Sequence, residues 1–114
     1  MTTIYGIPNC DTVKKARKWL DENQVPYQFH DFRKDGLSEA TLTEFITKTS
    51  WETLLNKRST SYRNLPDNIK NNLTSETAKQ AMLDEPTLIK RPVLCINAQV
   101  IVGFKADNFE KVTS

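Results

Sequence analysis

Cys10 is the residue of this sequence whose type and setting most clearly allow covalent chemistry. It follows Thr3-Ile4-Tyr5, an apolar run that predicts a strand, and the turn residues Gly6-Ile7-Pro8-Asn9. After it, apolar residues recur at helical spacing, at Val13, Ala16 and Leu20. Cys10 is therefore expected where a strand has ended and a helix begins.

The start of a helix is a favourable place for a reactive thiol. Asn9 is a plausible N-cap residue, which would place Cys10 at the first helical position. There the unpaired N–H groups and the positive end of the helix dipole stabilise a thiolate, whereas the carboxylate of Asp11 opposes it. Cys10 is a candidate nucleophile, and the alternative is a small buried residue without reactivity.

Length and composition predict one domain spanning residues 1–114. The chain is 38% hydrophobic and 26% charged, as ordinary globular proteins are, and its net charge of +2 is too small to indicate nucleic acid. No apolar run is long enough to span a membrane, and no signal peptide is visible. Two widely separated cysteines make no disulfide framework, so we expect a cytoplasmic protein with reduced thiols.

The middle of the chain predicts a second strand and then only helices. Residues 27–32 alternate aromatic and polar side chains, so the first two strands and the helix between them form a parallel βαβ unit. Helices follow in an insertion at about 38–86, with Ser38 and Ser50 as caps and an irregular segment at 56–65. His30 is interpreted as a surface residue, because a single histidine is too little for a metal site.

The end of the chain returns to strands. Val93–Ile96 is a continuous apolar run, Val100–Val102 completes a hairpin, and Asp107 can cap a last helix. Cys95 is interpreted as a core residue. The order is that of an α/β, thioredoxin-like fold: βαβ and ββα halves, a mixed four-stranded sheet and a helical insertion between strands two and three. In this arrangement Pro92 packs beside the nucleophile, and its isomer is left open.

Several segments together resemble the arsenate-reductase-like (ArsC/Spx) family, and most closely its YffB-like branch of glutathione-dependent thiol reductases. They are Y-G-I-P-N-C-D-T-V-K-K-A, D-F-R-K-D-G-L, L-L-N-K-R-S-T-S-Y-R, L-I-K-R-P-V-L and V-I-V-G-F. The resemblance implies that Cys10 and Arg91 are catalytic, and that Arg58, Asn9 and Pro92 bind the substrate. The helical insertion is expected to narrow access to the cysteine.

Two departures from the family decide between the functions that it offers. The resemblance implies that arsenate reductases of this type carry a third arginine in the segment after the hairpin. This chain has Gly103-Phe104 there. Spx regulators often have C-x-x-C at the helix start, and here the second position is Val13. The leading hypothesis is therefore a thiol–disulfide reductase with glutathione as co-substrate, no bound cofactor and no metal.

Two alternatives stay open at this point. One is an arsenate reductase linked to glutathione or glutaredoxin. The other is an Spx-like module that docks on a protein partner and lacks the C-x-x-C switch. The expected partners are glutathione and a small-molecule or protein disulfide, with no nucleic acid and no membrane.

Overall fold

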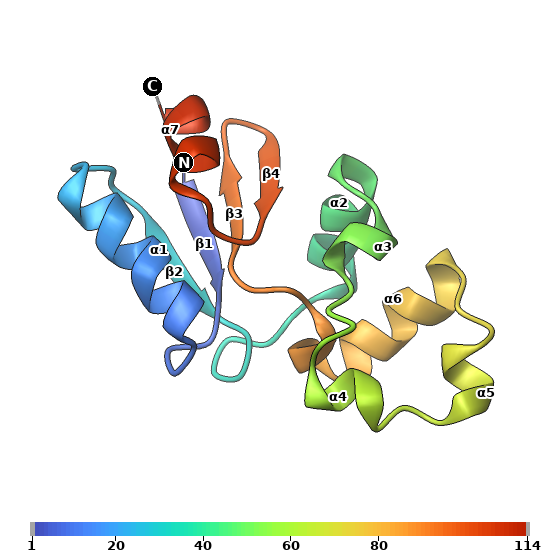
Figure 1. Cartoon of the computed structure of the whole chain (residues 1–114). Helices are drawn as coiled ribbons and strands as arrows, with labels where there is room; N and C mark the ends of the chain where they lie inside the picture. The colour runs from blue at the N-terminus through green and yellow to red at the C-terminus, as the bar shows by residue number, and fades with distance from the viewer. Residues whose placement is uncertain (1, 114) are drawn as a thin grey trace. The chain divides into compact units, whose positions relative to one another are not determined.

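Four strands form one mixed sheet in the order β2-β1-β3-β4 (Figure 1). The computed structural model describes residues 2–113. β1 (Thr2–Gly6) pairs in parallel with β2 (Gln28–Asp31) and antiparallel with β3 (Val93–Ile96). β3 in turn pairs antiparallel with β4 (Gln99–Val102) through a two-residue turn, Asn97-Ala98, at positive φ. The predicted α/β class and the order of strands and helices are confirmed.

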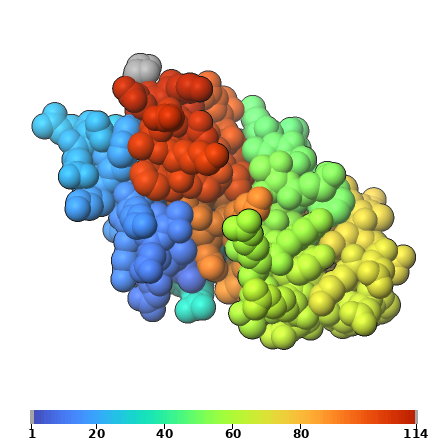
Figure 2. Space-filling model, viewed as in Figure 1, coloured from blue at the N-terminus to red at the C-terminus, as the bar shows by residue number. Residues whose placement is uncertain are grey.

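One face of the sheet is covered by two helices, α1 (Asp11–Glu22) and α7 (Ala106–Thr113). Figure 2 shows the blue and red surfaces of these two segments side by side. The apolar residues between the helices and the sheet form one cluster, each at most 7% exposed: Ile4, Ala16, Leu20, Leu94, Ile96 and Phe109. The 3.6-residue period of α1 and the two-residue period of the strands thus place their apolar sides against each other.

The predicted insertion between β2 and β3 is helical throughout most of its length. It contains α2 (Glu39–Lys48), α3 (Trp51–Leu54), α4 (Thr60–Arg63), α5 (Asp67–Lys70), α6 (Ser75–Asp84) and a 3-10 turn, η1 (Pro86–Leu88). Ser38 and Ser50 accept hydrogen bonds from Thr41 N–H and Thr53 N–H, as expected of caps. Its own core consists of residues with no exposed surface, among them Leu42, Phe45, Leu54, Ala78, Met82 and Leu88.

The structure corrects the prediction that residues 56–65 are irregular. This segment contains α4, whose N-cap Ser59 accepts a hydrogen bond from Tyr62 N–H. A helix of four residues has only one turn, so it shows no periodic pattern. The insertion also includes an isolated antiparallel bridge between Leu55 and Ile89, although no strand was expected there.

The chain divides into two compact units, which are described separately. Leu37–Lys90 is the helical unit, and the segments before and after it form the sheet unit. The single domain expected from length stays a prediction. No helix within residues 2–113 is long and apolar enough to cross a membrane.

Candidate active site

The end of β1 and the start of α1 place Cys10. Cys10 is the N-cap of α1, with extended backbone angles (φ −96°, ψ 123°). Its carbonyl accepts from Lys14 N–H at 2.9 Å, and its own N–H donates to the Ile7 carbonyl at 3.4 Å. The helix thus begins one residue later than predicted. Asn9 is exposed and lies outside the helix, so it is not the N-cap.

The N-cap position leaves the Cys10 thiol available for chemistry. The side chain makes no capping hydrogen bond, and the residue is half-buried. A serine or aspartate at this position would ordinarily accept from the N–H groups of the first turn. Those groups carry partial positive charge and favour an anion nearby, although the first-turn carboxylate of Asp11 opposes it. The geometry therefore suits a thiolate that attacks an incoming sulfur.

A close contact between Gly6 and Val13 determines how α1 approaches β1. A Cβ added at Gly6 would lie 2.7 Å from Cγ2 of Val13, closer than carbon atoms pack. Glycine at the end of β1 therefore allows the first turn of α1, and with it Cys10, to lie tightly against the strand. Sequence analysis identified Gly6 only as a turn residue. Its contact with Val13 depends on how α1 packs against β1, which turn residues and periodicity do not show.

Arg91 and Pro92 lie at the same end of the sheet as Cys10. Tyr5 pairs with Val93, and continuing this antiparallel register by one residue brings Pro92 opposite Gly6. Pro92 is buried, Arg91 is half-buried, and the peptide bond between them is cis. The register thus brings the start of β3 to the edge where β1 leads into the loop before Cys10.

The segment after the hairpin is also close to Pro92. Gly103 N–H donates to the Pro92 carbonyl at 2.8 Å, and Gly103 has a φ of +82°, which favours glycine. Phe104 follows, and its ring packs edge-on against Phe109 with the centroids 4.9 Å apart. Positions 103 and 104 therefore bring an apolar residue and no cationic side chain to this part of the fold.

The structure corrects the interpretation of His30 as a surface residue. His30 is half-buried, and its Nε2 atom lies 2.6 Å from the Gly36 carbonyl oxygen. Its ring centroid is 4.8 Å from that of Tyr5, on the neighbouring strand. The alternation in β2 correctly indicated two faces. It could not show that the second face is also partly covered.

Cys95 also differs from its prediction as a core residue. It is half-buried, whereas Leu94 and Ile96 on either side of it are buried. Side chains of a strand alternate between faces, so Cys95 points away from the cluster beneath α1 and α7. The apolar run at 93–96 had indicated equal burial of both faces. Cys10 and Cys95 are not joined in a disulfide.

Arg58 belongs to the helical unit, where it lines a basic hollow of about 570 Å³ together with Glu52, Leu55, Asn56, Lys57 and Lys90. The backbone around the hollow is tied by two hydrogen bonds of 2.7 Å, from Asn56 N–H to the Leu88 carbonyl and from Lys90 N–H to the Leu54 carbonyl. Arg58 is exposed, and its N–H donates to Asn56 Oδ1 at 3.1 Å. The approach of Arg58 to Cys10 stays a prediction. Residues 2–113 contain no group of three or more histidine, cysteine or acidic side chains that could hold a metal.

Comparison with known proteins identifies relatives along the whole chain. A model described as the ArsC family matches residues 5–112. The solved structure of a YffB protein is 39% identical, with a TM-score of 0.96 over 100% of both chains. An uncharacterized protein of Haemophilus influenzae is 44% identical over 96% of both chains. The global transcriptional regulator Spx 1 of Bacillus cereus is 26% identical over 97% of this chain and 86% of its own length. These matches confirm the resemblance and the thioredoxin-like fold.

Proposed function

This chain belongs to the ArsC family, and we propose that it is a thiol–disulfide reductase that uses Cys10 as nucleophile and glutathione as co-substrate. The observation that carries the proposal is the half-buried Cys10 thiol at the N-cap of α1, where it makes no capping hydrogen bond. Helix-terminal cysteines of this kind form a recurrent reactive class. The ArsC family includes reductases, which agrees with this chemistry.

The proposed reaction has two exchange steps. The Cys10 thiolate attacks the glutathione sulfur of a mixed disulfide, forms a Cys10–glutathione disulfide and releases the substrate as a thiolate. The thiolate of a second glutathione then attacks the glutathione sulfur of that intermediate. Glutathione disulfide leaves and the Cys10 thiolate is restored. In the net reaction, one glutathione thiolate and the mixed disulfide become the substrate thiolate and glutathione disulfide. One disulfide bond is broken for each one formed, so one cysteine is sufficient.

Arg91 is proposed to assist by binding an anionic group at the cysteine. The β1–β3 register brings the Arg91-Pro92 pair to the sheet end that leads to Cys10. A guanidinium group there would stabilise the thiolate and bind a glutathione carboxylate through two parallel hydrogen bonds. Arg58, Asn9 and Pro92 are proposed to complete the substrate site. Asn9 is exposed beside Cys10, and Pro92 would act through its shape.

Thiol exchange is favoured over arsenate reduction by the segment that contacts Pro92. An oxyanion out of water needs several charge-assisted donors. Gly103 and Phe104 offer no side-chain donor where the resemblance would place a third arginine. Arsenate in place of the disulfide substrate is therefore expected to give little turnover in the same assay.

The experiment measures reduction of a glutathionylated peptide by glutathione, with glutathione disulfide as the product read out. Cys10→Ser is expected to abolish turnover because serine without a general base is a weak nucleophile. Cys95→Ser, a matched control at the other cysteine, should retain most of it. Mass spectrometry should find one glutathione on Cys10 after exposure to oxidised glutathione. Turnover by Cys10→Ser, or an unmodified Cys10, would rule out the proposal.

A docking module is the second candidate, supported by the similarity to Spx 1 over nearly the whole chain. Position 13 holds valine, so a disulfide between positions 10 and 13 cannot operate as a switch. A docking function would require a surface of this fold and no thiolate. It would be unaffected by Cys10→Ser, which separates it from the reductase.

A further inference from the structure

A second surface with recognisable chemistry lies where α1 meets the start of β2. We call it the Arg17 surface, and it consists of Lys14, Arg17, Lys18, Asp21, Tyr27 and Phe29. Two hollows open on it. One, of about 280 Å³, is lined by the first five of these residues. The other, of about 460 Å³, is lined by Arg17, Asp21, Tyr27 and Phe29 with Val25 and Pro26. The two hollows share Arg17, Asp21 and Tyr27, and the second also has three apolar residues in its lining.

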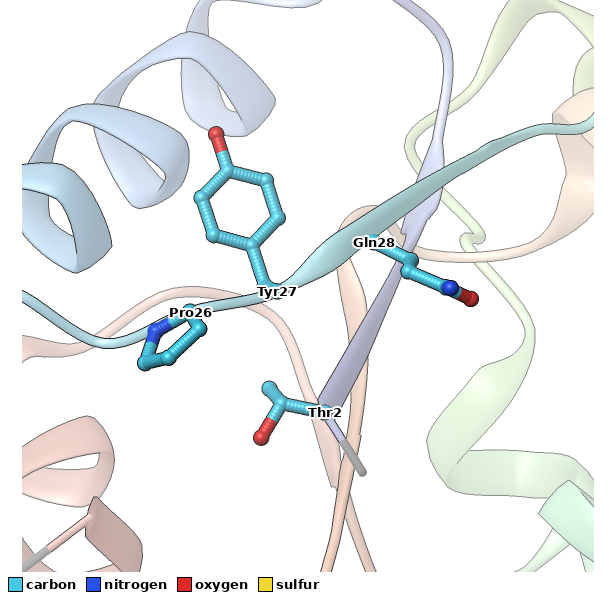
Figure 3. A pocket seen from close by; sticks show the side chains of 4 residues that line it. All are labelled: Thr2, Pro26, Tyr27 and Gln28. Carbon is cyan, nitrogen blue, oxygen red and sulfur yellow. The ribbon is translucent and has the colours of Figure 1, made fainter.

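The guanidinium group of Arg17, which lines both hollows, is held in place by aromatic residues. Its Nε donates to the Tyr27 hydroxyl at 3.2 Å, and its Cζ lies 4.3 Å from the centroid of the Phe29 ring. Figure 3 shows the Tyr27 ring pointing away from Thr2, on the other side of the strand. An arginine fixed by an aromatic face and a hydroxyl loses little side-chain entropy when it binds an anion.

The surface has three cations and one carboxylate, that of Asp21. Lys14 and Lys18 are exposed, and neither they nor Arg17 make a salt bridge with any carboxylate in the described part of the chain. The three cations occupy one helical turn, about 6 Å along the axis at 1.5 Å per residue. Sequence analysis could interpret these residues only as a solvated helix face, since it could not place Tyr27 and Phe29 beside them.

We propose that the Arg17 surface docks an acidic segment of a partner protein. Carboxylates of the segment would bind Arg17, Lys14 and Lys18, and a neighbouring apolar side chain would enter the part lined by Val25, Pro26 and Phe29. Charge complementarity selects an acidic partner, and the apolar side chains beside the cations favour one with a hydrophobic residue next to its acids. This binding does not require Cys10.

A polypeptide fits this surface better than a nucleic acid. Nucleic-acid sites spread cations along a backbone that bears a phosphate at every step, whereas these three are confined to one turn. The carboxylate of Asp21 lines both hollows, which opposes a polyphosphate chain. The net charge of the whole chain is only +2. A few carboxylates beside one apolar group match this pattern of charge.

The test uses the full chain and a fluorescein-labelled peptide with two aspartates on each side of one leucine, followed by fluorescence anisotropy at low salt. Arg17→Gln should weaken binding about tenfold, the size of one lost charge-assisted hydrogen bond, and Lys14→Gln with Lys18→Gln should weaken it further. Asp21→Asn should tighten it. Lys15→Gln is the matched control, because Lys15 is exposed on the same helix and lines neither hollow.

Three outcomes, measured on folded variants, would overturn the proposal. In the first, Lys15→Gln weakens peptide binding as much as Arg17→Gln, which would show that binding depends only on the net charge of the protein. In the second, the peptide with asparagines in place of aspartates binds equally well. In the third, an oligothymidine of equal charge binds more tightly through the same residues. Circular dichroism checks that each variant is folded. If Arg17→Gln unfolds the chain, Tyr27→Phe, which removes only the hydroxyl, should still weaken peptide binding, and an unchanged affinity would count against docking.

Discussion

At the residue scale, Cys10 and Cys95 make an internal comparison. Both thiols are half-buried, so exposure alone does not separate them. Cys10 is the N-cap of a helix, whereas Cys95 is in the central strand β3, paired with Thr3 on one side and Val100 on the other. A difference between the reaction rates of the two thiols would therefore reflect their settings, the helix terminus for Cys10 and the paired strand for Cys95.

We expect Cys10 to react with iodoacetamide faster than Cys95 in the native protein at neutral pH. The helix N-terminus stabilises the thiolate that performs the attack. Mass spectrometry of peptides after timed labelling gives both rates. In denaturant, where neither environment persists, the two rates should converge. A Cys95 that reacts as fast as Cys10 in the native protein would remove the physical basis of the reductase proposal.

Replacement of Arg91 tests a second residue of the proposed site. Arg91→Ala should weaken glutathione binding by about 1–3 kcal/mol, the value of a hydrogen bond to a charged group. The melting temperature should hardly change, because the Arg91 side chain is only half-buried. Arg91→Lys is the control, because it keeps the positive charge and lacks the planar guanidinium group. Its affinity for glutathione should lie between those of the original protein and of Arg91→Ala. Unchanged binding would exclude a role in the site, and a large loss of melting temperature would indicate a structural one.

At the element scale, the contact between β1 and α1 should determine both stability and the position of Cys10. Gly6→Ala places a methyl group against Cγ2 of Val13, so we expect a loss of about 1–3 kcal/mol in the free energy of unfolding. Urea denaturation measures it.

The matched control for this contact is the double variant Gly6→Ala, Val13→Ala. Removing the valine methyl groups makes room for the new one, so the double variant should lose less stability than the two single variants added together. Additive losses would show that the contact does not couple strand and helix. A Gly6→Ala protein as stable as the original would show that the helix shifts at no cost.

At the scale of the whole molecule, the reductase proposal includes Arg58, a residue of the helical unit. Arg58→Ala should then lower kcat/KM for the glutathionylated peptide by about tenfold, as expected for one lost charge-assisted hydrogen bond. Arg63→Ala removes the same charge from another exposed position of the helical unit and should leave kcat/KM unchanged. Equal effects of the two variants would remove Arg58 from the site.

The sequence alone determined the features that depend on neighbours along the chain. The start of α2 agrees with prediction because its serine cap, Ser38, directly precedes the helix. The bounds of β3 agree because a short apolar run ends at a tight turn. Cys10 could be placed between strand and helix from turn residues and periodicity. Capping hydrogen bonds and side-chain alternation involve only residues that are close together in the chain, so they can be predicted from a single sequence.

The tertiary structure decided which residues meet across the chain. The contact of Gly6 with Val13, the hydrogen bond from Gly103 to Pro92 and the partial exposure of Cys95 depend on packing between elements. The Arg17 surface likewise exists only because the crossover from α1 to β2 brings Tyr27 and Phe29 back beside the helix. Such contacts depend on strand register and on helix packing, which are properties of the folded chain as a whole and have no local pattern to indicate them.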